Sequence, residues 1–174
     1  IYLAELLYRA AQAQAKNAAM DVDSQSSVTP VQVLQKYGRL VDETAEFMAS
    51  FATYDTIHKR YILKGCIPAQ ETLPADTTFN PPFELSYWHY ALETAQQWRL
   101  RRGLTRNAMW DKVLASLSPL AYNADSLYLA AESATDTYTN TRCTSDHPAL
   151  LGALGVLPDC QLIDDKVMSR TLDW

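Results

Sequence analysis

The sequence predicts an all-α chain of antiparallel helical hairpins that are joined by two long loops. Apolar residues recur at three- and four-residue spacing along most of the chain, which is the period of an amphipathic helix. Proline or a capping side chain precedes several of these segments, and glycine follows others, as expected at helix starts and ends. No repeat of fixed period occurs, which argues against a regular solenoid.

The first two helices are predicted over residues 1–19 and from Pro30 onward, with a polar loop over 20–29 between them. Thr29-Pro30-Val31-Gln32 has the pattern of a capping box with proline at the first helical position. This second helix is expected to end near Tyr54. Ile1 begins within an amphipathic pattern and Trp174 ends within another, so we expect the chain to be part of a longer one.

The middle of the chain is predicted to contain a short strand over 60–63 and a long irregular loop over 64–80. Residues 81–102 then predict a helix that is apolar on nearly every face, which is typical of a buried helix. A fourth helix is expected over 107–117 and a short strand over 126–131.

The last part of the chain is predicted to begin with a second long polar loop over 132–145. A fifth helix is expected over 146–155 with Asp146 or its neighbour as the cap, and a sixth from Asp164 onward. If consecutive helices run antiparallel, both long loops lead into helix N-termini on the same face. Loops longer than about 12–15 residues are commonly functional, so this face is the expected site.

Composition excludes several classes of function. The chain has 174 residues, of which 48% are hydrophobic and 20% charged, so it can bury a core. A net charge of −5 argues against sequence-independent nucleic-acid binding, which requires many cations. No apolar run approaches the roughly 20 residues needed to span a bilayer, so no membrane partner is expected.

The cysteine pattern does not predict a metal site. Cys66, Cys143 and Cys160 have no CxxC spacing, and only three histidines accompany them. A disulfide between Cys143 and Cys160 is left open, because it depends on a Cα geometry that sequence does not reveal.

Three acids on or beside the long loops are candidates for chemistry, namely Glu71, Glu84 and Asp146. Each also has a simpler structural interpretation. A loop glutamate such as Glu71 is commonly solvated, Glu84 suits the first turn of a helix, and Asp146 suits an N-cap. The neighbouring aromatic residues are mostly expected to form core.

Four segments carry a resemblance to a known family. They comprise Tyr61-Ile62-Leu63, Ile67-Pro68-Ala69-Gln70-Glu71, Phe79–Trp88 and Arg142–Pro158, the last containing Ser145-Asp146-His147-Pro148. In these segments the chain resembles the six-hairpin glycosidases, especially those related to glycoside hydrolase family 65. The resemblance implies that residues 1–174 form about half of an (α/α)₆ barrel, within one catalytic domain, with short β segments in the long loops. It also implies that another segment or chain completes the barrel.

The resemblance implies an inverting glycoside hydrolase acting on an oligo- or polysaccharide, without metal or cofactor. Glu71 stands where the family has its general acid, and Asp146 is the candidate base; an inverting pair lies roughly 6.5–9.5 Å apart. The expected substrate-binding residues are Phe79, Asn80, Tyr87, Trp88 and His147. Secretion is expected from the habits of the family and from the open disulfide.

Two alternatives remain open. A disaccharide phosphorylase is disfavoured, because Ser145-Asp146 stands where the phosphorylases carry Lys-Gln, and an acid repels phosphate. A non-catalytic module that binds carbohydrate or protein is kept open by Ala69-Gln70, which departs from the Pro-Asp of the family's acid loop. A solvent-facing Glu71 would favour this module, whereas a pocket holding Glu71 and Asp146 would favour the hydrolase.

Overall fold

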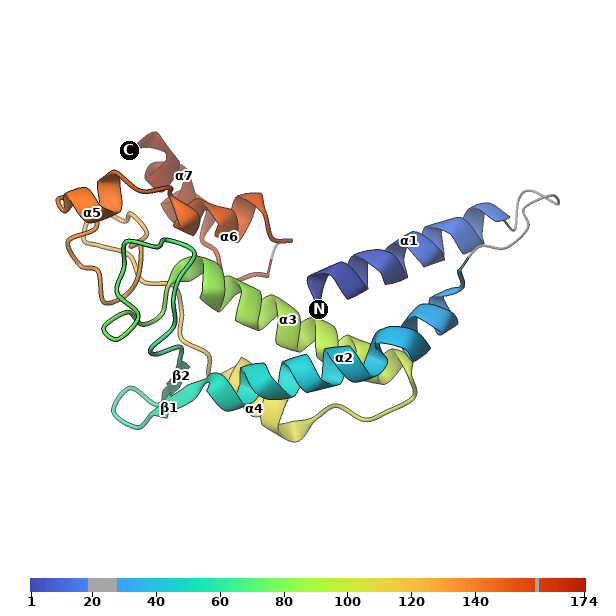
Figure 1. Cartoon of the computed structure of the whole chain (residues 1–174). Helices are drawn as coiled ribbons and strands as arrows, with labels where there is room; N and C mark the ends of the chain where they lie inside the picture. The colour runs from blue at the N-terminus through green and yellow to red at the C-terminus, as the bar shows by residue number, and fades with distance from the viewer. Residues whose placement is uncertain (19–27, 159) are drawn as a thin grey trace. The chain divides into compact units, whose positions relative to one another are not determined.

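The computed structural model describes residues 1–18, 28–158 and 160–174 and is mostly helical, which confirms the all-α class (Figure 1). The α-helices are α1 (Tyr2–Ala18), α2 (Pro30–Phe51), α3 (Pro82–Arg101), α4 (Ala108–Ala115), α5 (Thr141–Thr144), α6 (Gly152–Gly155) and α7 (Asp165–Asp173). A 3-10 helix, η1, covers Ala149–Leu151, and strands β1 (Thr53–Asp55) and β2 (Arg60–Ile62) pair antiparallel. Within the described ranges, no helix combines the length and apolar character that crossing a bilayer requires.

The chain divides into two compact units. Unit 1 comprises residues 1–49 and 91–112, and unit 2 comprises 50–90 and 113–174. The first unit therefore contains α1 and most of α2, and the second contains both strands and both long loops. Each unit is described separately below.

The start of α2 matches its prediction. The backbone amide of Thr29 donates to Gln32 Oε1 at 2.8 Å, and the amide of Gln32 donates to Thr29 Oγ1 at 3.2 Å. This is the reciprocal capping box that the sequence predicts. The helix ends at Phe51 rather than near Tyr54, because Tyr54 belongs to β1 and pairs with Tyr61. Most of the predicted 20–29 loop lies outside the described residues.

A buried carboxylate joins α1 to the second half of α3 in unit 1. Glu5 is only 2% exposed and accepts hydrogen bonds from Trp98 Nε1 at 2.7 Å, Arg101 Nη1 at 2.6 Å and Arg9 Nε at 2.9 Å. Burial alone would raise the pKa of Glu5, but the hydrogen bonds from Arg101, Arg9 and Trp98 together lower it. The Arg101 guanidinium also lies 4.3 Å from the centre of the Tyr8 ring.

A buried asparagine organises the irregular part of unit 2. Asn80 is fully buried, and its side chain accepts from Leu63 N at 2.9 Å and donates to Ser118 Oγ at 3.1 Å and Glu132 Oε2 at 2.7 Å. Arg60 forms an ion pair with the same Glu132. Asn80 has a φ of 51°, in the left-handed region that asparagine tolerates better than most residues. The end of the 64–80 loop is thereby tied to β2 and to residue 132.

The predicted strand over 126–131 is wrong. Residues 127–131 are buried, but they form no named strand, and only an isolated bridge joins Tyr128 to Tyr122. The apolar run therefore reflects burial and not sheet pairing, a distinction that periodicity cannot make over so few residues.

The predicted helix over 146–155 is also wrong. Instead, Asn140 caps the short α5, and the chain then passes through η1 into α6. Pro148 accounts for the interruption, because proline disfavours helical backbone at the residue before it. Asp146 therefore lies between helices and caps neither. The final helix matches its prediction, since Asp164 caps α7 by accepting from the Lys166 and Val167 amides.

All three cysteines are free thiols, so the disulfide between Cys143 and Cys160 is not formed. Without it, secretion rests on the family resemblance alone. No group of three or more His, Cys, Asp or Glu side chains suited to a metal ion occurs among the described residues.

Candidate functional site

The two long loops meet in unit 2, as the sequence predicts (Figure 1). Gln70 Nε2 donates to the Cys143 carbonyl at 3.2 Å, and Thr72 Oγ1 donates to the Arg142 carbonyl at 2.8 Å. The amide of Thr72 donates to Asp146 Oδ2 at 3.1 Å, and its hydroxyl, which shares its single proton between the Arg142 carbonyl and Asp146, lies 2.9 Å from the same Oδ2. These contacts hold the Ala69–Thr72 turn against the 142–147 segment.

Apolar packing lies beneath this junction. Leu73 belongs to a buried cluster whose other members are Ala130, Ala131, Ala134 and Cys143. The side chain that follows the turn is therefore inserted into the core formed by the 130–143 segment, and the turn cannot shift without exposing apolar surface.

Glu71 lies in the middle of this turn, with its side chain exposed. Its neighbour Gln70 is only 2% exposed and points into the protein. None of the described residues forms a hydrogen bond or an ion pair with the Glu71 carboxylate. The structure thus fixes the backbone on both sides of Glu71 and leaves its carboxylate facing solvent.

Four atoms of Thr72 and His147 lie within hydrogen-bond distance of the Asp146 carboxylate. The amide and hydroxyl of Thr72 contact Oδ2. The other oxygen, Oδ1, lies 2.7 Å from the His147 amide nitrogen and 2.8 Å from His147 Nδ1. The Thr72 amide, the Thr72 hydroxyl and His147 lower the pKa of Asp146. Because His147 Nε2 faces a carbonyl and therefore donates, Nδ1 also donates to Asp146 when the imidazole is protonated.

His147 reaches the turn from the opposite end of its ring. Its Nε2 atom lies 2.5 Å from the Ala69 carbonyl oxygen. The histidine therefore bridges Asp146 and the backbone two residues before Glu71. Of the five predicted substrate-binding residues, it is the one that contacts the Glu71 turn and Asp146 through bonds described above.

Glu84 is the third candidate acid of the sequence, to which neither a catalytic nor a binding role was assigned. It lies in the first turn of α3, is half-buried, and accepts from the Ala69 amide at 2.6 Å. Burial raises the pKa of Glu84, and the hydrogen bonds from the Ala69 and Glu84 amides only partly offset this. The sequence signal was ambiguous, because an acid in a first helical turn is normally explained by the helix dipole.

Phe79 and Asn80, two of the predicted substrate-binding residues, have half-buried and fully buried side chains, respectively. Phe79 is half-buried, and its amide donates to Ser133 Oγ at 3.1 Å. The side chain of Asn80 is fully buried and already bound to Leu63, Ser118 and Glu132.

Tyr87 and Trp88 are half-buried on α3. The Trp88 ring lies 5.6 Å from the Phe51 ring, and the Tyr87 ring lies 6.4 Å from the Tyr90 ring, measured between centroids. Both predicted sugar-binding residues therefore take part in aromatic packing within unit 2.

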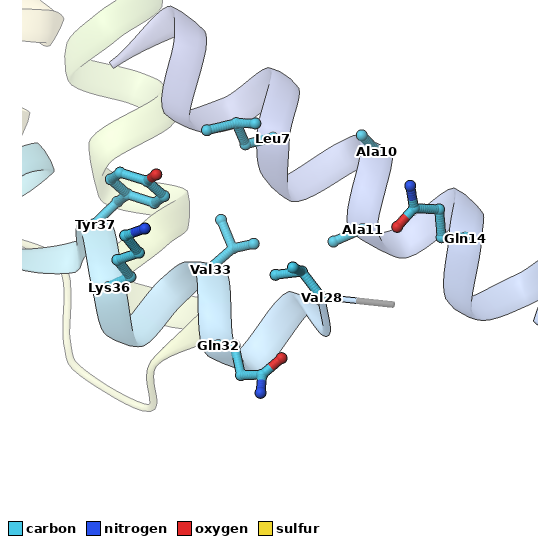
Figure 2. A pocket seen from close by; sticks show the side chains of 9 residues that line it. All are labelled: Leu7, Ala10, Ala11, Gln14, Val28, Gln32, Val33, Lys36 and Tyr37. Carbon is cyan, nitrogen blue, oxygen red and sulfur yellow. The ribbon is translucent and has the colours of Figure 1, made fainter. Parts of the chain in front are cut away.

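Hollows in both units add to this description, and a small one of about 80 Å³ in unit 2 lies beneath the turn, with Gln70, Cys143 and Thr144 in its lining. The larger hollow in unit 2 has a volume of about 290 Å³ and is lined by Ala69, Phe83, His147, Pro148, Ala149, Gly152 and Val156. It lies beside the Glu71 turn, but its lining is mainly apolar. The groove in unit 1 has a volume of about 480 Å³ and is lined by Leu7, Ala10, Ala11, Gln14, Val28, Gln32, Val33, Lys36 and Tyr37 (Figure 2). None of the three candidate acids lines it.

The chain matches no known family model, and no curated protein is significantly similar to it. The resemblance to six-hairpin glycosidases therefore stays a prediction from the sequence segments quoted above.

Proposed function

We propose that this chain carries the acid-bearing loop of a glycoside hydrolase that cleaves an oligo- or polysaccharide with inversion. The observation that supports this proposal is the Ala69–Thr72 turn. Its backbone is held by the 142–147 segment, while the Glu71 carboxylate stays exposed and unengaged by any described residue. A general acid needs a positioned backbone and a carboxyl group that can reach the glycosidic oxygen. The held backbone of Glu71 meets the first requirement. Its carboxylate is accessible, but neither Glu71 nor Asp146 lines the hollow beside the turn, which favours the second candidate below.

In this proposal Glu71 protonates the leaving oxygen, and Asp146 takes a proton from the attacking water. Since Thr72 and His147 contact both oxygens of Asp146, it can act only when one of these groups moves away. The contact with His147 Nδ1 is the one that a rotation of the imidazole would release. Neither step requires a metal ion or an organic cofactor.

The proposed domain is about half of an (α/α)₆ barrel, which another segment or chain completes. Three leucines on α1 are consistent with such a partner, since Leu3 is 72%, Leu6 44% and Leu7 47% exposed. Exposed leucines along one helix are costly to leave in water, and packing against further helices of the same barrel would bury them.

The test is hydrolysis of α-linked disaccharides by the intact protein, with and without inorganic phosphate. We expect Glu71→Gln to lower kcat by about 10²–10⁴-fold, as for loss of a general acid. Asp76→Asn is the matched control, because Asp76 is another exposed acid of the same loop. The control should keep full activity, and NMR of the first product should show an inverted anomer. Equal activity in the parent and Glu71→Gln would contradict the proposal.

A non-catalytic binding module is the second candidate. The solvent-facing Glu71 and the contacts on both oxygens of Asp146 favour it. It predicts sugar or protein binding that Glu71→Gln leaves unchanged, with no cleavage of any substrate. Cleavage that depends on phosphate and releases a sugar phosphate would instead indicate a phosphorylase.

A further inference from the structure

Both backbone polar atoms of Ala69, its amide nitrogen and its carbonyl oxygen, are contacted by side chains. Its amide donates to Glu84 Oε1 at 2.6 Å, and its carbonyl oxygen lies 2.5 Å from His147 Nε2. These partners come from α3 and from the segment before η1, so they approach the peptide from different parts of unit 2. The amide belongs to the Pro68–Ala69 peptide plane and the carbonyl to the Ala69–Gln70 plane, so the two contacts restrict two consecutive peptide planes. Ala69 lies two residues before Glu71.

The second half of the turn has separate anchors. Thr72 is bound to Asp146 and to the Arg142 carbonyl, and the Gln70 side chain is bound to the Cys143 carbonyl. All of these anchors come from residues 142–146. Glu84 is thus the member of this set that ties the turn to a long helix, the 20-residue α3.

Glu84 occupies a position that is unfavourable for a charge. It is half-buried, and its negative charge also helps to raise the pKa of the half-buried Cys66 thiol, after the larger effect of the thiol's own burial. None of the described residues forms an ion pair with Glu84. A carboxylate in such a position needs hydrogen-bond donors, and the Ala69 amide is one that it has.

We propose that Glu84 is a positioning residue for Glu71, which holds the Ala69 amide and thereby sets the direction in which the turn presents the Glu71 side chain. The effect of Glu84 on catalysis rests on the proposed function. The effect of Glu84 on the backbone does not, because the hydrogen bond from the Ala69 amide to Glu84 is present without substrate. Loss of the Glu84 acceptor releases the Ala69 amide, while His147 still contacts the Ala69 carbonyl and the anchors to 142–146 keep the second half of the turn in place.

The test measures amide hydrogen exchange at Ala69 by NMR in the intact protein, in parallel with kcat and KM. We expect Glu84→Ala to accelerate amide exchange at Ala69 about tenfold or more. A tenfold change corresponds to the loss of one hydrogen bond that contributes about 1.4 kcal/mol. Glu84→Gln keeps an acceptor oxygen and should restore most of the protection. The matched control is Asp165→Ala, which removes an exposed first-turn acid of α7. It should leave exchange at Ala69 unchanged.

The two readouts separate this inference from the proposed function. In an active enzyme, Glu84→Ala should lower kcat with little change in KM, and Glu84→Gln should recover kcat. If the protein has no hydrolase activity but Glu84→Ala accelerates amide exchange at Ala69, the backbone role of Glu84 is supported and only the proposed function is contradicted. Unchanged exchange in Glu84→Ala overturns the inference, and so does faster exchange with an unaltered kcat in an active enzyme.

Discussion

Thr72 contacts Oδ2 of Asp146 through both its amide and its hydroxyl, although the two residues are 74 positions apart in the sequence. The amide and ring Nδ1 of His147 lie at hydrogen-bond distance from the other oxygen of the same carboxylate. Asp146 therefore joins the two long loops of unit 2 by binding Thr72, the residue that follows the proposed general acid Glu71. Any catalytic role of Asp146 has to be compatible with this structural one.

Removing the Thr72 hydroxyl should loosen the Glu71 loop without unfolding unit 2. Thr72→Val deletes the bonds to Asp146 Oδ2 and to the Arg142 carbonyl, but it keeps the amide donor. We expect faster limited proteolysis within residues 64–80 and a small change in global stability, since a segment with fewer anchors opens locally. Thr77→Val is the control, because the Thr77 hydroxyl contacts only the Pro74 carbonyl, at 3.5 Å.

The link between Thr72 and Asp146 should also depend on acidity. The pKa of Asp146 is lowered in the folded protein from an ordinary value of 3.8, chiefly by the Thr72 amide. Its contribution to stability is therefore present above pH 3.8 and is lost as the pH falls through the lower, folded value. Proteolysis of the loop in the parent should approach that of Asp146→Asn only in strongly acidic solution. Equal rates in both proteins at neutral pH would contradict the prediction.

Glu84 should have the opposite pH dependence. Burial raises its pKa above the ordinary value of 4.5, so the folded state binds a proton more readily than the unfolded state. Its contribution to stability is fully present below pH 4.5 and is lost as the pH rises through the folded value. We therefore expect Glu84→Gln, which resembles the neutral acid, to gain stability relative to the parent as the pH rises above 4.5. Urea unfolding at several pH values measures this difference, and a constant difference would contradict it.

Unit 1 should depend strongly on its buried carboxylate. Glu5→Ala leaves the Trp98 indole and the Arg101 guanidinium without their partner, and breaking a buried ion pair commonly costs about 3 kcal/mol or more. Urea unfolding should show this loss at neutral pH. The parent should lose the same stabilisation on acidification, because the pKa of Glu5 is lowered from 4.5. Glu43→Gln is the control, since the Arg39–Glu43 pair is exposed and should contribute little.

The helix ends could be predicted because their signals are local. The Thr29 and Gln32 capping box, the Asp164 cap and the C-terminal Gly103, with a φ of 75°, each involve residues within one helical turn. Gly103 is likewise a local signal, because glycine adopts the left-handed backbone at a helix end without any contact to a distant residue. Such features depend on a few neighbouring side chains and are therefore readable from the sequence.

The candidate site could be predicted only in outline. The sequence indicated that the two long loops meet, but Asp146 was predicted to cap a helix and instead binds Thr72 across 74 positions. Glu84 looked like an ordinary first-turn acid, and its burial and its bond to Ala69 follow from how the 64–80 loop packs on α3. Glu84 does lie in the first turn of α3, as predicted, but its contact with Ala69 and that of Asp146 with Thr72 join distant segments, about which periodicity and capping patterns carry no information.

Asn80 should control the stability of unit 2 rather than the affinity for a ligand. Asn80→Ala leaves the buried Leu63 amide without its acceptor, removes one of the donors to Glu132 and places alanine at a φ of 51°, so we expect a loss of about 3 kcal/mol or more. Asn80→Gly loses the same hydrogen bonds but tolerates the left-handed backbone, so it should be about 1 kcal/mol more stable than Asn80→Ala. Urea unfolding of the two variants separates the side-chain bonds from the backbone strain. Unchanged stability combined with weaker sugar binding would contradict this prediction and show that Asn80 contacts substrate. A fully buried side chain can contact a ligand only after it has released its interior partners.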